Sequence, residues 1–167
     1  MPLERFRWLA GAIAAHPDRK VVGRTRLQKE IKLLQRLRFP TEYSYTLHFY
    51  GPYSEGLHAE IGLLESLGLV EEEPQISREG NPFYILRAKP EAVLPDIERF
   101  QQYIDRMHAA EAVVLELAAT YDMFRSMGSD HQEACERLRR KKGSKCDGGN
   151  LEQALTLLGD LGLETSE

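Results

Sequence analysis

The sequence is poor in cysteine and has neither a long apolar run nor an excess of positive charge, and each shortage excludes a class of protein. Its two cysteines, Cys135 and Cys146, lack the paired spacing of a zinc site, so we expect two free thiols in a reducing compartment. A disulfide between them is the alternative. No apolar run approaches the roughly 18 residues of a membrane span, and residues 1–15 carry charges where a signal peptide needs an apolar run. These shortages predict a soluble, cytoplasmic protein.

The charge balance and the missing motifs argue against two further classes. A net charge of −4 argues against a general polyanion binder, because nonspecific affinity for nucleic acid comes mostly from basic side chains. The overall net charge does not exclude a local basic patch. The histidines are scattered without HxxxH spacing, and neither a GxSxG elbow nor a glycine-rich phosphate loop occurs. We therefore predict no enzyme activity, no catalytic residue, no metal site and no cofactor.

The first half begins with two helices and a strand. Apolar residues at helical spacing predict helices at residues 2–15 and 25–38, and Thr25 and Gln28 can form a capping box at the start of the second. Residues 43–50 are rich in aromatic and β-branched side chains and end at a Gly-Pro pair, which indicates a strand.

A third helix and a hairpin complete this half. Ser54 can cap the helix and Gly68 can end it, with a buried stripe of leucine and isoleucine between them. Residues 69–73 and 83–87 are expected to pair across a long tip. The order of these elements predicts that residues 1–89 form a winged helix-turn-helix domain with a small β-hairpin wing.

Residues 90–167 predict a helical subdomain that packs on the first half. An amphipathic helix is expected near 94–104, and residues 109–124 are apolar on most sides, which is typical of a central or sandwiched helix. Asp130 can cap a charged helix, and residues 150–163 form a last amphipathic helix. The predicted fold is mainly α, within the α+β class.

The second helix carries a basic stripe opposite its apolar face. On a helical wheel Lys29, Lys32 and Arg36 fall together, and Arg78 adds a cation at the tip of the wing. The functional interpretation is contact with nucleic-acid phosphates. An ordinary solvated face and the docking of an acidic partner are the alternatives.

The third helix, which reads bases in many winged helices, lacks the side chains for that task. Its outward side comprises Glu55, Ala59, Gly62 and Ser66, without the arginine, lysine, asparagine or glutamine that makes bidentate base contacts. A glycine in mid-helix costs up to about 1 kcal/mol relative to alanine. A face of small residues suits close approach by another helix, from the second half or from a partner protein.

A second basic run lies between residues 137 and 145, next to a glycine-rich loop. Its six cations could bind nucleic acid or an acidic partner. The alternative is a solvated helix end whose cations complement the helix dipole.

The segments GRTRLQKEIKLLQ at 23–35 and FYGPYSEGLHAEIGLLESLGLV at 49–70 resemble the YwgA-like family of small prokaryotic proteins. The late segments ACERLRRKK and LEQALTLLGDLGL also resemble the helical tail of that family. The first half is similar, in addition, to the SocA-like antitoxin domain known as Panacea. That second resemblance implies neutralisation of a toxin through protein contact.

Two functions follow as hypotheses. The first is a nucleic-acid-associated regulator linked to defence or toxin systems, in which the basic stripe touches DNA; a homodimer would favour it, since paired half-sites need two-fold symmetry. The second is an antitoxin-like interaction module that binds a partner protein through the third helix and does not bind DNA.

Overall fold

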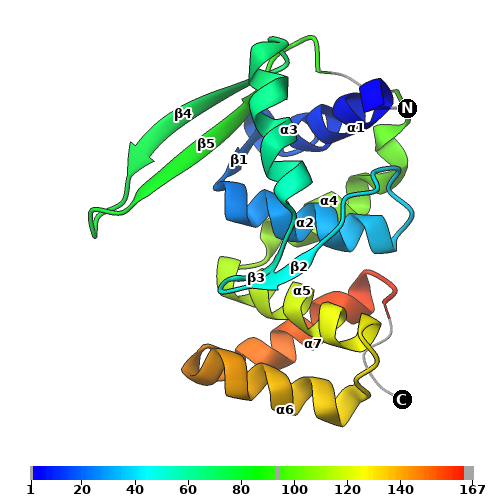
Figure 1. Ribbon diagram of the computed structural model, residues 1–167, viewed down its shortest axis with the longest axis vertical. Coiled ribbons are helices and arrows are strands. Elements are labelled where there is room, and N and C mark those ends of the chain that lie inside the picture. The colour runs from blue at the N-terminus through cyan, green and yellow to red at the C-terminus, as the bar shows by residue number, and fades with distance from the viewer. Residues whose placement is uncertain (1, 93–94, 164–167) are drawn as a thin grey trace.

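The computed structural model describes residues 2–92 and 95–163. Figure 1 shows an elongated molecule, with the early helices and a projecting hairpin in the upper part and the late helices below. The α-helices of the described residues are α1 (Pro2–Ala14), α2 (Arg24–Arg36), α3 (Glu55–Ser66), α4 (Gln101–Ala109), α5 (Ala112–Ser126), α6 (His131–Lys142) and α7 (Asn150–Asp160). Short 3₁₀ segments η1 (Pro17–Arg19), η2 (Pro95–Phe100) and η3 (Gly143–Cys146) connect some of them.

The strands form two small antiparallel sheets. They are β1 (Lys20–Val22), β2 (Thr46–His48), β3 (Gly51–Tyr53), β4 (Val70–Ile76) and β5 (Pro82–Ala88). One sheet has the order β1-β5-β4, and the other is the β2-β3 hairpin. The fold is therefore mainly helical and belongs to the α+β class, as predicted.

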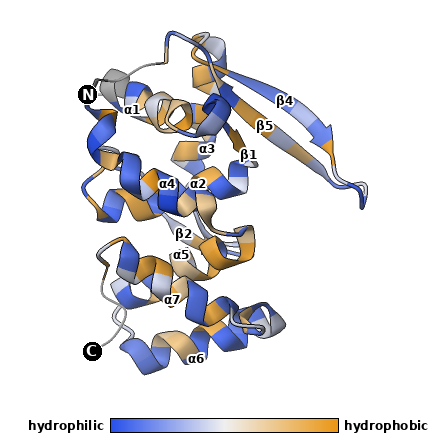
Figure 2. Ribbon diagram, turned by 180° about the vertical axis from the view of Figure 1, so that it is seen from behind, coloured by the Kyte–Doolittle hydropathy of each residue, from blue (hydrophilic) through white to orange (hydrophobic). Residues whose placement is uncertain are grey.

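The β4-β5 hairpin extends well beyond the helices in both views (Figures 1 and 2). It is longer than predicted, because its register runs from Val70 opposite Ala88 to Ile76 opposite Pro82. Strand β1, whose Val21 lies opposite Leu86 of β5, falls between the two predicted helices and was not predicted. A strand of three residues is too short to show a period of two.

The start of α2 differs from the prediction. Gly23, with φ of +99°, is the N-cap residue, and no side chain caps this end. The predicted capping box of Thr25 and Gln28 is therefore wrong, because the helix begins one residue earlier and the Gln28 amide binds elsewhere. Helix α2 also ends two residues before the predicted Arg38, which has a left-handed φ of +72°.

Helix α3 has the predicted ends. The Ser54 Oγ accepts a hydrogen bond from the Leu57 backbone N–H at 3.1 Å, and Gly68 follows the helix with φ of +75°. On the inner face, the buried Glu60 carboxylate accepts hydrogen bonds from Tyr43 and Arg5. The strand predicted at 43–50 is reduced to Thr46–His48, the first arm of the β2-β3 hairpin.

Helix α5 is the central helix of the second half, as its apolar sequence predicted. It contacts α2 and β3 on one side and α6 and α7 on the other. The helix expected near 94–104 consists of η2 and α4, and Leu94 lies outside the described residues. Asp130 caps α6 as predicted, in a capping box with Glu133.

A single cluster of buried apolar side chains runs through both halves of the chain. Cys135 and Cys146 are buried within it as free thiols, as predicted, and burial raises the pKa of both. No described helix is long and apolar enough to cross a membrane. The division into residues 1–89 and 90–167 stays a prediction.

Candidate functional site

The predicted basic stripe of α2 is covered by the second half of the chain. Lys29 and Lys32 are 3% and 7% exposed, and every residue of α2 from Leu27 to Leu34 is buried. The expectation that these lysines form an exposed stripe is therefore wrong. The wheel placed them correctly on one face, but that face meets α5 and the β2-β3 hairpin instead of solvent.

Lys32 is paired with a carboxylate of α5. Its Nζ lies 2.7 Å from the Asp122 Oδ2, and both side chains are buried. The Arg36 Nε lies 3.1 Å from both oxygens of the same carboxylate, although the Arg36 side chain is 46% exposed. The cations predicted for phosphate thus neutralise an internal acid, because a carboxylate buried in α5 requires opposite charge.

Lys29 holds the β2-β3 hairpin. Its Nζ donates to the Pro52 carbonyl at 3.0 Å, and burial lowers the pKa of Lys29 to about 8. The neighbouring Gly51 has φ of +104°, and a Cβ at this position would lie 2.6 Å from the Thr120 Oγ1. Only glycine allows this close approach of the hairpin to α5.

Gln28 fastens the hairpin to the start of α3. Its side-chain amide donates to the Ser54 carbonyl at 2.9 Å and accepts from the Ser54 N–H at 2.8 Å. The GPYS motif and the Gln-Lys pair of α2 are therefore two parts of one internal clasp. We call Gln28, Lys29, Lys32, Gly51 and Asp122 the α2 clasp.

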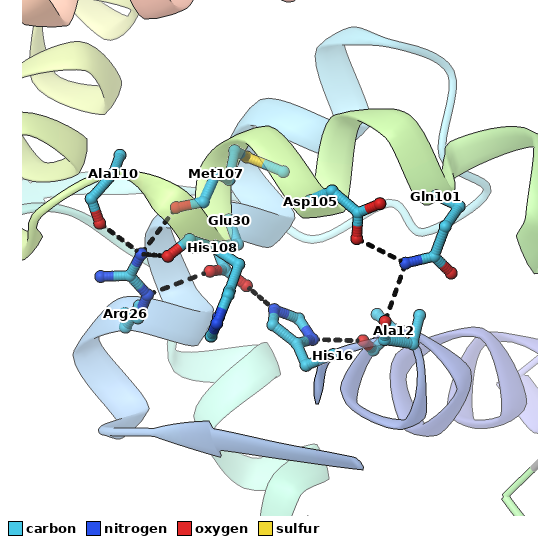
Figure 3. Close-up of polar contacts among 10 residues, drawn as sticks. Ala12, His16, Arg26, Glu30, Gln101, Asp105, Met107, His108 and Ala110 are labelled. Atoms are coloured by element: carbon cyan, nitrogen blue, oxygen red, sulfur yellow. Dashed lines mark hydrogen bonds and ion pairs between the residues drawn. The ribbon is translucent and has the colours of Figure 1, made fainter. Parts of the chain in front are cut away.

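A network around His16 and Glu30 joins α1, α2 and α4 (Figure 3). The His16 Nε2 lies 2.6 Å from the Glu30 Oε1, and its Nδ1 lies 2.7 Å from the Ala12 carbonyl oxygen. Burial disfavours the charged imidazolium, yet the hydrogen bond and the charge of Glu30 outweigh burial and raise the pKa of His16. Arg26 pairs with Glu30 at 3.2 Å and donates to the Met107, His108 and Ala110 carbonyls at the end of α4.

Buried polar contacts in this network connect three helices. His16 is 4% exposed, and with Arg26 and His108 it borders a cleft of about 470 Å³. No group of three or more potential metal-ligating side chains was found among the described residues.

The four residues predicted on the outer face of α3 are all exposed. Glu55, Ala59, Gly62 and Ser66 face away from the core, and a Cβ at Gly62 would have no atom within 4 Å. The second half of the chain does not cover this face, which removes one of the two predicted neighbours. We call these four residues the α3 face.

Two exposed leucines continue the α3 face toward an apolar cleft. Leu63 and Leu67 are 47% and 55% exposed. Leu67 also borders a cleft of about 410 Å³, whose other lining residues are Phe6, Arg7, Ala10, Leu69, Glu91 and Ala92.

The remaining predicted cation, Arg78, is exposed in the turn between β4 and β5. It lies at the far tip of the projecting hairpin, away from α2 (Figure 1). The structure therefore does not bring Arg78 together with Lys29, Lys32 and Arg36.

The fold and its internal clasp define a small mainly helical α+β protein. The chain is 31% identical over 121 residues to "Uncharacterized protein YwgA" of Bacillus subtilis (strain 168), covering 68% of this chain and 72% of that protein. The chain belongs to the YwgA family. No family model and no solved structure matches it. The resemblance to the Panacea domain stays a prediction.

Proposed function

We propose that this protein is a non-enzymatic interaction module of the winged-helix type that binds a partner protein through the α3 face. The winged-helix interpretation is supported by the chain order α1, β1, α2, α3, β4, β5 and by the sheet order β1-β5-β4. In this interpretation α3 is the outward helix and the β4-β5 hairpin is the wing.

The observation that carries the proposal is the open space at Gly62. Glycine in a helix interior is less favourable than alanine by about 0.8–1.0 kcal/mol. No neighbouring atom lies within 4 Å of the position of a Cβ, and the φ of Gly62 is not in the left-handed region. Nothing inside the described fold requires glycine here, whereas Gly51 is required by Thr120. A partner backbone that approaches α3 closely would require it.

The chemistry of the surroundings favours a basic amphipathic helix as the partner. Leu63, Leu67 and the neighbouring cleft can accept apolar side chains. Glu55 and Glu65 are exposed on α3, and Glu71 is exposed on the adjacent β4. Two copies of this acidic face would repel each other, so the charges disfavour a homodimer through α3 and favour a partner with lysine or arginine.

The hypothesis of a nucleic-acid regulator loses its main support, since Lys29 and Lys32 are buried and α3 carries no base-reading side chain. Whether the partner is a toxin, as the Panacea resemblance implies, stays a prediction.

Site-specific photo-crosslinking tests the proposal. A photoreactive residue at Ala59 or Ser66, in cells that produce the protein, should give one discrete adduct with another protein. The same group at Glu152, which is exposed on α7, is the matched control and should not give that adduct.

Competition makes the test specific to the α3 face. Unlabelled wild-type protein should abolish the adduct, whereas a Gly62→Leu variant should not, because its side chain fills the approach without disturbing the core. An adduct that forms equally from Glu152, or that the Gly62→Leu variant competes away, would contradict the proposal.

A further inference from the structure

The second basic run, at the end of α6, divides into buried and exposed cations. Lys142 is 8% exposed; its Nζ lies 2.6 Å from the Glu116 Oε2 and donates to the Phe49 carbonyl at 3.0 Å. Arg139, Arg140 and Lys141 are exposed, and none of them forms an ion pair with another described residue. Residues 137–146 contain no acid. This end of the molecule therefore has local positive charge despite the overall charge of −4.

The fold places two exposed aromatic rings beside the end of this basic run. Phe49 and Tyr50 form the turn between β2 and β3 and are 79% and 55% exposed. Their ring centroids lie 5.0 Å apart at an interplanar angle of 79°. Lys142 holds the Phe49 backbone, and the Lys145 Nζ lies 5.3 Å from the Tyr50 ring centroid. The turn is thus fixed against α6 with its rings in solvent.

A shallow cleft continues from the hairpin along α6. It has a volume of about 280 Å³ and is lined by Leu47, Phe124, Arg137, Arg140 and Lys141. Aromatic, aliphatic and cationic groups therefore lie along the side of α6 that faces the β2-β3 hairpin, and α6 itself is at the opposite end of the molecule from α1 (Figure 1). Figure 2 shows that α6 is largely hydrophilic apart from a few apolar residues.

We propose that this surface, which we call the α6 ledge, binds single-stranded nucleic acid. Its members are Phe49, Tyr50, Arg140 and Lys141. Proteins that bind single strands without sequence preference combine a basic groove for the backbone with aromatic side chains on which bases stack. The α6 ledge has both parts, and in a duplex the bases are already stacked and paired, so Phe49 and Tyr50 would find no free base face.

An acidic peptide would use the cations of the α6 ledge but would leave the two aromatic rings without a role. The exposed rings therefore favour single-stranded nucleic acid over an acidic peptide. Both RNA and DNA offer unstacked bases and phosphates, so the ledge accepts either chemistry and the test must separate them.

Fluorescence anisotropy of the full chain tests this inference with labelled oligothymidylate and oligouridylate of about 15 nucleotides, near the upper end of known site sizes per domain. Binding should weaken with salt at a slope near −0.7 per neutralised phosphate, or about −1.4 for the two cations Arg140 and Lys141. Stacking of one base contributes about 1–3 kcal/mol. Phe49→Ala or Tyr50→Ala should therefore weaken binding about 5-fold to 150-fold.

Matched variants separate the ledge from general charge and hydrophobicity. Arg140→Glu should weaken binding and flatten the salt slope, whereas Arg78→Glu, which changes an exposed cation on the distant hairpin, should not. Ile76→Ala is the control for the aromatic variants, because Ile76 is 73% exposed on the same hairpin. Circular dichroism checks that each variant is folded.

Three results would overturn the inference. They are the absence of binding to both oligonucleotides at low salt, a duplex that binds as tightly as either single strand, and oligonucleotide binding that is unchanged by both Phe49→Ala and Tyr50→Ala. A preference for one oligonucleotide supports the inference and identifies the nucleic acid. Because the ledge and the α3 face are tested with different variants, failure of one leaves the other standing.

Discussion

Replacing Asp122 with alanine removes the carboxylate that neutralises the buried end of Lys32. The Lys32 Nζ lies 2.7 Å from the Asp122 Oδ2, and the side chains are only 9% and 4% exposed. In the variant the Lys32 ammonium group would remain buried between α2 and α5 without its partner. Arg36, whose side chain is 46% exposed, would regain water on losing the same carboxylate.

The expected loss is dominated by Lys32. Removing one member of a buried ion pair costs about 3–5 kcal/mol, because the remaining charge stays desolvated. The exposed pair with Arg36 adds at most about 1 kcal/mol. Domains of this size are stable by about 5–15 kcal/mol, so Asp122→Ala should remove a large part of the stability. A double variant, Lys32→Met with Asp122→Leu, should recover most of the loss, since both charges are then absent.

Urea unfolding measures these differences with two probes. Far-ultraviolet circular dichroism reports on all helices, and fluorescence reports on Trp8 of α1, which packs edge-on against Phe39 and against Phe100 of the second half. The two transitions should coincide if the halves unfold together. A loss below about 1 kcal/mol in Asp122→Ala would refute the reasoning, since that is the value for an exposed pair.

Three further predictions concern single residues. Gly51→Ala should destabilise the protein by about 2–5 kcal/mol in the same urea assay, because it combines a positive φ with a contact of 2.6 Å to Thr120; an unchanged midpoint would contradict this geometry. Gly62→Ala should instead raise the free energy of unfolding by up to about 1 kcal/mol, and a loss would show that the fold itself needs glycine there. The pKa of His16 is higher in the folded than in the unfolded protein. The pair with Glu30 therefore contributes its full stabilisation of the folded state below the unfolded pKa, and this contribution is lost as the pH rises through the folded pKa. The urea midpoint of the wild type should therefore fall relative to that of His16→Gln from about pH 5.5 to 8.5, and parallel profiles would exclude the linkage.

Local patterns predicted the elements that depend on neighbouring residues. The cap at Ser54, the end of α3 at Gly68 and the capping residue Asp130 were all confirmed, because each satisfies backbone groups within one helical turn. The outward direction of the α3 face followed from the period of 3.6 residues, and its exposure was confirmed.

Periodicity did not predict that the basic stripe on α2 is covered. Periodicity tells which side chains share a face, but it does not tell what meets that face. The partner of Lys32 is Asp122, ninety positions away in the chain. A signal was present in α5, whose Glu116 and Asp122 interrupt a segment that is apolar on most sides. Acids in a buried helix need internal cations.

The meeting of Phe49 and Tyr50 with α6 had no local signal. The aromatic turn and the basic run are separated by about ninety positions, and their contact depends on how α5 places α6 beside the β2-β3 hairpin. The basic run was recognised in the sequence, but Phe49 and Tyr50 were expected at the end of a strand, and their proximity to α6 was not predicted.

Competitive acylation of lysine amines, read by mass spectrometry, tests most directly whether α2 is an internal clasp. In the folded protein Lys29 and Lys32 should react far more slowly than the exposed Lys89 and Lys141, and all four should react alike after denaturation. An accessible lysine with a pKa near 8 would react faster than an ordinary one, so slow acylation of Lys29 can only reflect burial. If Lys29 and Lys32 react as fast as Lys141 in the folded chain, the internal clasp is wrong and the basic stripe is exposed.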